Sequence, residues 1–179
     1  PGREYNAQLM ALLGSETPPD ILYTWGGGHL RALRDAGFAR NIANEMAEDW
    51  VFQFKPGALQ NYTLDGGIYG APRHQSMVSL YANRSILAEA GVDLAQLETW
   101  DGFLDAVEKL KAQGVTPLAV GGADMWPFHF YFGPLSQQLA GRSGFEAALT
   151  GTGEGFAAEP FVQAGTQFQR LADLAPFQS

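Results

Sequence analysis

The most distinctive chemistry-bearing stretch of this 179-residue chain is a tryptophan followed by three glycines, Trp25 and Gly26-Gly27-Gly28. The face of an indole ring can stack on the apolar face of a ligand ring, and glycines such as Gly27 let a ligand approach the backbone closely. The alternative is a core tryptophan that lies beneath the turn. We favour a binding role, because a large ring before three glycines has little side-chain cover from its neighbours.

A second tryptophan, Trp126, follows the turn Gly121-Gly122-Ala123-Asp124, which comes after a predicted strand. Ligands of open α/β sheets gather at the carboxyl ends of strands. Asp124 could accept hydrogen bonds from ligand hydroxyls there, although an aspartate in such a place can also simply form the turn.

The tetrad Arg73, His74, Gln75 and Ser76 lies on an extended connection between two predicted strands. His74 and Gln75 can hydrogen-bond to hydroxyl groups, and Arg73 can do the same or form an ion pair between two lobes. The alternative for the whole tetrad is a solvated loop.

Several kinds of catalytic site find no support in the sequence. The triple glycine fits neither G-x-x-x-x-G-K-[ST] nor G-x-G-x-x-G, and no G-x-S-x-G is present. The three histidines are scattered without an H-E-x-x-H, so we expect no metal site and no cofactor. The sequence does not exclude the paired carboxylates of a glycosidase, but Asp101, Asp105 and Glu108 map to a solvated helix face.

Composition narrows the class of protein further. Hydrophobic residues make up 46% of the chain, as in a globular protein, and no apolar run approaches the length of about 18 residues that a membrane helix needs. The net charge of −8 disfavours nucleic acid and anionic membranes as partners. The absence of cysteine excludes disulfides and thiolate zinc sites.

The elements that must position these residues alternate between helix and strand, which predicts an α/β fold. Thr99 is expected to cap a helix that Gly114 ends, and Gly91 to end a shorter one. The remaining helices are predicted at 4–13, 29–36, 44–52, 56–60, 85–90, 128–139, 145–149 and 161–171. Strands are predicted at 21–25, 68–71, 78–82 and 118–120, with a hairpin turn at Asp65-Gly66.

Three stretches together resemble one known family. They are PPDILYTWGGGHLRALRDAGFARNI, then YGAPRHQSMVSLYANRSILAEAGV, then TWDGFLDAVEKLKAQGVTPLAVGGADMWP. In this order they look like the extracellular solute-binding proteins of ABC sugar importers, the maltose-binding-like group. The resemblance covers nearly the whole chain. It departs from the family pattern at Arg84, where lysine is usual, and at Tyr81-Ala82-Asn83, which replaces a direct Tyr-Asn.

The resemblance implies a two-lobed, periplasmic-binding-protein-like α/β fold that is incomplete at both ends. Residues 1–75 would be part of lobe 1, without its first strand and helix, and residues 76–179 part of lobe 2, without its C-terminal remainder. The chain would cross between the lobes at about 72–78. We therefore expect a fragment of a longer protein, which can self-associate, whereas the full-length form is expected to be monomeric.

The resemblance also implies a function. The protein would bind a sugar or oligosaccharide in a cleft between the lobes and deliver it to the transmembrane subunits of an ABC permease, without catalysis. Trp126 corresponds to a position where the family often has a sugar-stacking tryptophan. The expected ligand-binding residues are Trp25, Gly27, Arg73, His74, Gln75, Asp124 and Trp126.

The expected location is periplasmic or extracellular, with a lipid anchor as one option for the full-length form. The alternative is an α/β enzyme that acts on a glycosidic or phosphorylated substrate. A chemoreceptor-type binding protein would differ from the transporter component in its partner and not in its site.

Overall fold

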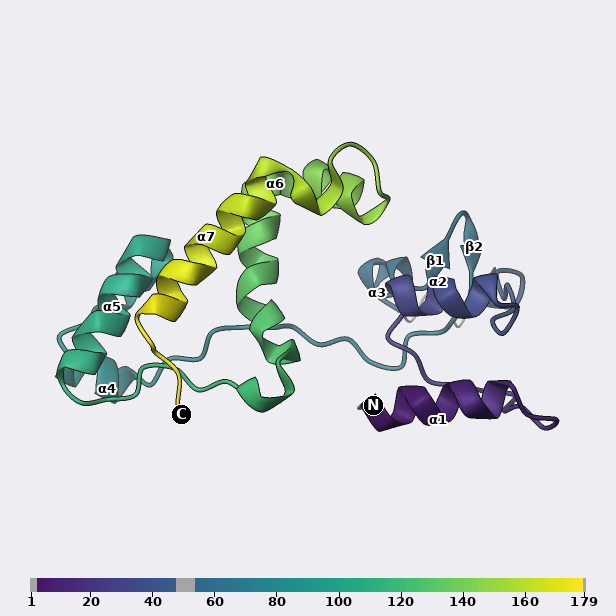
Figure 1. The fold of residues 1–179 in the computed structure, drawn as a ribbon, viewed down its shortest axis with the longest axis horizontal. Coiled ribbons are helices and arrows are strands. Elements are labelled where there is room, and N and C mark those ends of the chain that lie inside the picture. Colours follow the sequence, from purple (N-terminus) through teal and green to yellow (C-terminus); the bar gives the residue numbers. More distant parts are fainter. Residues whose placement is uncertain (1–2, 48–53, 179) are drawn as a thin grey trace. The chain divides into compact units, whose positions relative to one another are not determined.

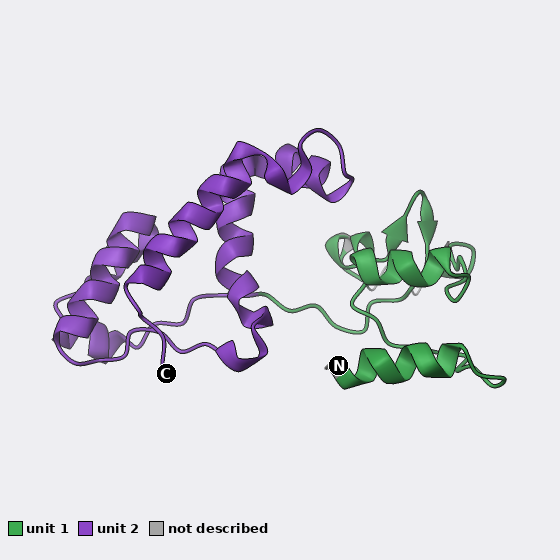
Figure 2. Ribbon diagram, in the orientation of Figure 1, with its two compact units in different colours: residues 1–77 green, residues 78–179 purple. Residues whose placement is uncertain are grey.

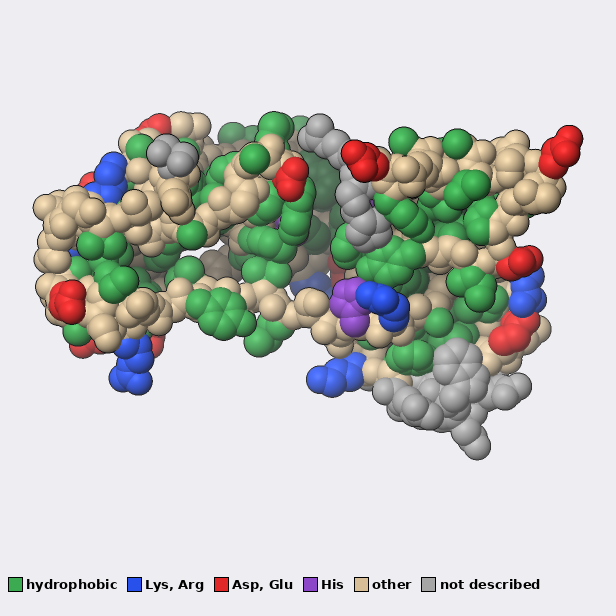
Figure 3. Space-filling model, turned by 90° about the horizontal axis from the view of Figure 1, so that it is seen from below, with side chains coloured by type: hydrophobic (Ala, Val, Ile, Leu, Met, Phe, Trp, Pro, Cys, Tyr) green, Lys and Arg blue, Asp and Glu red, His purple; other side chains and the backbone are tan. Residues whose placement is uncertain are grey.

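The computed structural model describes residues 3–47 and 54–178, which form two compact units, residues 1–77 and 78–179 (Figure 2). Each unit is described by itself. On the face shown in Figure 3, hydrophobic side chains reach the surface of both units, and charged side chains are scattered among these hydrophobic side chains. The assignment of the chain to two lobes that meet at residue 75 stays a prediction.

Unit 1 consists of short helices and one hairpin (Figure 1). Among its described residues, the helices are α1 (Arg3–Leu13), α2 (Gly27–Asp35) and α3 (Pro56–Gln60), and a 3₁₀ turn lies at Glu45–Ala47. Strands β1 (Thr63–Leu64) and β2 (Gly67–Ile68) pair antiparallel. The predicted helices at 4–13, 29–36 and 56–60 are confirmed to within two residues, and most of the one predicted at 44–52 lies outside the described residues.

The core of unit 1 joins α1 to α2. Leu9 and Leu13 are four residues apart, so they lie on one face of α1, where they pack against Leu33 of α2. Tyr5 and Leu22 border this cluster. The cluster fixes the segment between the two helices, which contains Trp25.

The hairpin turn has the backbone geometry that its sequence predicts. Asp65 and Gly66 have φ angles of 49° and 83°, the left-handed pair that a two-residue type I′ turn requires. Of the strand predicted at 68–71, only Ile68 is paired. The Asp65 carboxylate accepts hydrogen bonds from Arg34 at 2.6 Å and from Arg31 at 3.3 Å, which ties the hairpin to α2.

Unit 2 is mostly helical in the part that the structure describes. Its α-helices are α4 (Arg84–Glu89), α5 (Trp100–Ala112), α6 (His129–Leu149) and α7 (Glu159–Asp173). Short 3₁₀ helices lie at Leu94–Glu98, Gly122–Asp124, Trp126–Phe128 and Gly155–Ala157. No helix among residues 3–47 and 54–178 is long and apolar enough to span a membrane.

The ends of α4 and α5 carry the predicted signals. The Thr99 hydroxyl accepts a hydrogen bond from the Gly102 N–H at 3.1 Å and so caps α5. Gly91 and Gly114, which follow α4 and α5, have φ angles of 65° and 75° and end these helices in the left-handed conformation.

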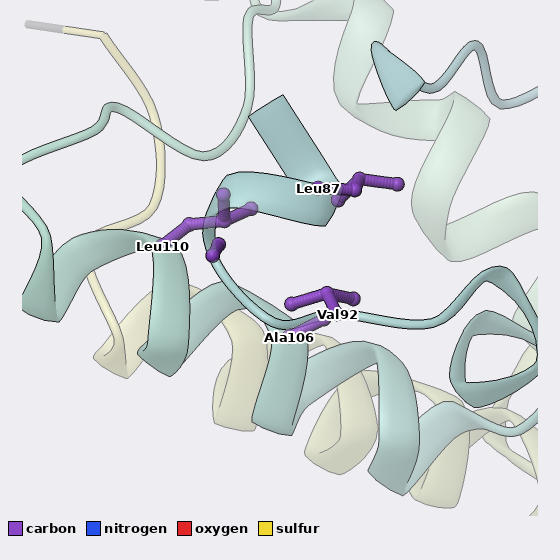
Figure 4. Close-up of a cluster of buried hydrophobic side chains, with 5 residues drawn as sticks. Leu87, Val92, Ala106 and Leu110 are labelled. Carbon is purple, nitrogen blue, oxygen red and sulfur yellow. The ribbon is translucent and has the colours of Figure 1, made fainter. Parts of the chain in front are cut away.

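Two hydrophobic clusters hold unit 2 together. In the first, Leu87 of α4 and Val92 of the following loop pack against Ala106 and Leu110 of α5 (Figure 4). In the second, Leu171 of α7 is fully buried against α5. Helix α5 therefore contributes one face to each cluster.

The predictions of strands at 21–25 and 78–82 are wrong, since both segments are extended but unpaired in the part of the chain that the structure describes. The segment at 118–120 makes one isolated parallel bridge, Leu118 to Phe177. A strand exists only if a neighbouring strand accepts its backbone hydrogen bonds, and among the described residues the segments 21–25 and 78–82 have no such neighbour.

The predicted buried helix at 128–139 needs a second correction. Helix α6 continues to Leu149 through a non-helical residue, Gly141 (φ 65°, ψ 174°), and so includes the helix predicted at 145–149. Only Leu135, Ser136 and Ala148 of α6 are buried, because helix α7 covers it on one side. The helix predicted at 161–171 is confirmed as α7, with Phe161, Ala164 and Leu171 buried.

Candidate functional site

Trp25 lies at the surface of unit 1, with 52% of the residue exposed. Its ring meets the ring of Tyr23 edge-to-face, with 5.6 Å between the centroids and an angle of 78° between the planes. Tyr23 in turn meets Tyr5 of α1 edge-to-face at 6.5 Å. The Trp25 ring is therefore supported from one side by an aromatic row that is anchored on α1.

The segment that carries Tyr23 and Trp25 is held without strand pairing. The Tyr5 hydroxyl donates a hydrogen bond to the Tyr23 carbonyl oxygen at 2.8 Å and accepts one from the Tyr23 N–H at 3.0 Å. One side chain thus satisfies both backbone groups of Tyr23, which holds the backbone of this segment in place.

The glycines after Trp25 serve two different purposes. A Cβ atom on Gly26 would lie 2.7 Å from the Asn61 carbonyl oxygen, and that oxygen accepts a hydrogen bond from the Gly27 N–H at 2.8 Å. Gly26 is therefore needed for the close approach of two chain segments. No atom lies within 4 Å of the position that a Cβ of Gly27 would occupy, so the backbone there faces open space that a ligand can enter.

Tyr62 belongs to the same surface, although no sequence signal identified it. Its ring packs so tightly against the backbone at Gly70 that a Cβ there would lie 2.8 Å away. Burial, together with the nearby Tyr23, raises the pKa of the Tyr62 hydroxyl, and a tyrosine hydroxyl is already neutral at physiological pH, so it can donate a hydrogen bond.

Of the polar tetrad, Arg73 joins this aromatic surface. Its guanidinium carbon lies 5.5 Å from the centre of the Tyr23 ring, in cation–π geometry. The amide nitrogen of Gln75 lies near Gly57 of α3. His74 is exposed, and no hydrogen bond or ring contact fixes it within the described part of the chain.

In unit 2, Trp126 is also at the surface, with 59% of the residue exposed. Phe130 supports its ring edge-to-face at 5.4 Å, and the His129 ring lies at 5.9 Å, tilted by 33°. The His129 Nδ1 atom lies 2.7 Å from the Trp126 carbonyl oxygen, which places an Nδ1–H donor there. The first turn of α6 therefore holds Trp126.

The turn before Trp126 is unusual, because Met125 has a φ angle of 63° although it is not a glycine. Such backbone angles cost free energy and concentrate at functional sites. The carboxylate of the exposed Asp124 has no hydrogen-bond partner among residues 3–47 and 54–178 and is free to accept.

The structure thus brings together Trp25, Gly27 and Arg73 in unit 1 and places Asp124 and Trp126 on one turn of unit 2. That the two groups face a common cleft stays a prediction. Sequence reasoning missed Tyr23 and Tyr62. Tyr23 is two residues before Trp25 on an extended segment, where side chains two apart point to the same side, so this spacing could have identified it.

Carboxylates give little support to a hydrolytic centre. Asp101 is paired with Arg170 at 2.8 Å, and Asp105 and Glu108 are exposed on the solvated face of α5. In the part that the structure describes, no three histidine, aspartate or glutamate side chains are grouped so as to hold a metal ion.

Comparisons with known proteins agree on one family. The model of the family described as "Bacterial extracellular solute-binding protein" matches residues 2–176. An arabinooligosaccharide-binding protein of Halalkalibacterium halodurans is 29% identical over 107 residues, which are 57% of this chain and 23% of that protein. An ABC transporter extracellular-binding protein of Pyrococcus horikoshii is 26% identical over 145 residues, 80% of this chain and 33% of its own length.

A solved structure shares the fold. It comes from a study of xylan utilization by Caldanaerobius polysaccharolyticus and is 26% identical, with a TM-score of 0.81 over 98% of this chain and 44% of that one. The predicted periplasmic-binding-protein-like α/β fold is thereby confirmed, and the chain spans less than half the length of these relatives. With its family model matched from residue 2 to residue 176, the chain belongs to the bacterial extracellular solute-binding proteins.

Proposed function

We propose that the protein binds an oligosaccharide, with Trp25 and Trp126 as stacking platforms, and delivers it to the permease of an ABC transporter outside the cytoplasmic membrane. The observation that carries this proposal is the Trp25 ring, which is half exposed, rigidly supported by Tyr23, and next to open backbone at Gly27. A sugar ring stacks on such a face while its hydroxyls bond to neighbouring polar groups.

The names of the relatives support the choice of ligand class. One relative is named for arabino-oligosaccharides, and the solved structure comes from work on xylan utilization. The first name specifies an oligosaccharide, and the second names a polysaccharide. The proposal includes no bond-making or bond-breaking step, a monomeric full-length protein, and attachment to the cell envelope by a lipid anchor.

The test is a binding titration of the complete protein with arabino- and xylo-oligosaccharides, followed by tryptophan fluorescence and calorimetry. Trp25→Ala and Trp126→Ala should each weaken binding about tenfold to hundredfold, as the loss of an aromatic anchor does. The melting temperature of the unliganded protein should barely change, since both rings are exposed.

Trp100→Phe is the control, because Trp100 is partly buried and stacks on Phe103 in the second hydrophobic cluster of unit 2. It should leave the affinity unchanged. If Trp25→Ala and Trp126→Ala bind every sugar as the wild type does, or lose stability without losing affinity, the two rings are structural and the proposal is wrong.

A further inference from the structure

The arginines of this chain differ in what surrounds their charge. Five of them have a carboxylate partner within 4 Å, namely Arg31, Arg34, Arg40, Arg142 and Arg170. Of those whose side chains the structure describes, Arg73 and Arg84 have none. This is notable in a chain with 19 acidic and 11 basic residues, where a carboxylate partner is easy to supply.

Arg73 is distinguished from Arg84 by its aromatic neighbour. The guanidinium lies 5.5 Å from the centre of the Tyr23 ring, whereas no ring lies against Arg84 in the described part of the chain. Tyr23 itself is fixed by the two hydrogen bonds with Tyr5. The cation of Arg73 is therefore held in place by a ring that is already fixed.

Arg34 provides an internal comparison. Its guanidinium lies 5.6 Å from the Tyr69 ring, a similar geometry, but it is also paired with Asp35 at 2.7 Å and Asp65 at 2.6 Å. The positive charge of Arg34 is therefore compensated by two carboxylates of the same unit. Arg73 has no carboxylate partner in the part of the chain that the structure describes, and its exposed side chain lies over Tyr23, which contacts Trp25.

We infer that Arg73 recognises a carboxylate on the bound oligosaccharide, so that the preferred ligand carries a uronic acid. This inference rests on the proposed function. The planar guanidinium presents paired N–H donors that match a carboxylate, while the uncharged rings of the ligand stack on Trp25. The neutral hydroxyl of Tyr62 adds a donor on the same surface.

The experiment compares two ligands that differ in one group, a xylo-oligosaccharide and the same oligosaccharide with a single glucuronic acid branch. Calorimetric titration of the complete protein should show at least tenfold tighter binding of the acidic ligand. That preference should fall as NaCl is raised from about 20 mM to about 500 mM. This change shortens the Debye length about fivefold, so that salt screens the exposed charges.

Variants assign the preference to Arg73. Arg73→Met should reduce the ratio of the two affinities to about one, Arg73→Lys should retain part of it, and Tyr23→Leu should reduce it because the guanidinium loses its support. Arg84→Met removes the second of the two described arginines that lack a carboxylate partner and should leave the ratio unchanged.

Equal binding of the acidic and neutral ligands by the wild type, or an undiminished preference in Arg73→Met, overturns the inference but leaves the proposed function standing. Absence of binding to every oligosaccharide overturns the proposed function and the inference with it. Tyr23→Leu should also have a lower melting temperature, because it loses contacts with Tyr5. A change of affinity in that variant can therefore have two causes, so the result for Arg73→Met decides whether the inference holds.

Discussion

At the scale of single residues, Met125 sets the direction in which Trp126 leaves the chain. Its φ of 63° lies where a side chain with a Cβ is disfavoured, so the residue stores strain of about 1–3 kcal/mol. The strain is maintained by the buried Pro127 and by the first turn of α6, which hold the following residues. The Trp126 ring is consequently presented by a fixed turn.

Replacing Met125 by glycine should relieve this strain. Glycine loses about 0.5–1 kcal/mol through the entropy of the unfolded chain, so the net effect should be a gain of about 1 kcal/mol in the free energy of unfolding. Urea unfolding measures it. Met10→Gly, on the exposed face of α1, is the matched control and should lose about 0.7–1 kcal/mol. An equal loss in both variants would show that Met125 is not strained.

The ion pairs of Asp65 make the stability of the hairpin turn depend on pH. The hydrogen bond from Arg34, and then the charge of Arg31, lower the pKa of the Asp65 carboxyl below its ordinary value. A lowered folded pKa contributes stability above the unfolded pKa of about 3.9, and this contribution is lost as pH falls through the lower folded value.

Asp65→Asn tests this coupling, because asparagine also tolerates the left-handed turn. The variant should be slightly less stable than the wild type at pH 7 by urea midpoint. The difference should shrink in 1 M NaCl, begin to decrease as the pH falls below about 4, and be lost once the pH is below the lowered folded pKa of Asp65. A difference that is the same at pH 7 and pH 3 would assign it to the turn and not to the ion pairs.

At the scale of elements, the packing of α7 on α5 holds unit 2 together. Leu171 has no exposed surface and contacts the buried face of α5 that includes Val107. The two helices lie side by side in Figure 1. The position of the turn that carries Trp126 depends on this packing, since the ring of Phe128 also packs against the ring of Phe168 of α7, with 6.1 Å between the ring centroids.

Leu171→Ala should therefore lower the free energy of unfolding by about 2–5 kcal/mol, through lost burial and the cavity left behind. Chemical denaturation of the complete protein measures this loss. Val162→Ala, on the exposed side of the same helix, should change stability by less than about 0.5 kcal/mol. Similar losses for the two variants would mean that α7 does not pack as described.

How much could be predicted from sequence differs between helices and strands. Helix α5 was predictable because its apolar spacing, its Thr99 cap and Gly114 are all local signals. The segments 21–25 and 78–82 have strand-like composition, but whether they pair depends on distant partners that local pattern does not reveal.

The candidate site divides in the same way. Trp25 and Gly27 were predictable from adjacency in the chain, whereas Tyr62 reaches the site only because the backbone of Asn61 bonds to Gly27. Likewise, the sequence offered Arg73 two roles, a ligand contact or an ion pair between lobes. Its position over Tyr23 depends on a contact between residues 50 positions apart.

At the scale of the whole molecule, one extended segment is left open. Residues 71–82 make no backbone hydrogen bond with any described part of the chain, and Met77 and Tyr81 are 85% and 90% exposed. Next to this segment, in unit 2, is an apolar hollow of about 320 Å³ whose lining includes Leu80, Ile86 and Leu118. Unpaired backbone beside exposed apolar side chains recruits further strands.

We therefore expect these 179 residues, expressed alone, to self-associate and to bind oligosaccharide poorly. Light scattering and calorimetry measure both properties. Leu80→Lys, which places a charge on the open segment, should reduce association, whereas Leu149→Lys, the same change at the exposed end of α6, should not. A monomer with a sharp cooperative melt and the affinity of the complete protein would contradict this expectation.

The most direct test of the account is whether the complete protein holds an oligosaccharide without altering it. Isothermal titration with xylo- and arabino-oligosaccharides, followed by chromatography of the released sugar, measures binding and turnover in one sample. The account predicts saturable one-to-one binding that Trp25→Ala weakens at least tenfold, with the sugar recovered at its original length. No saturable binding of any oligosaccharide, or the appearance of shortened products, would contradict it.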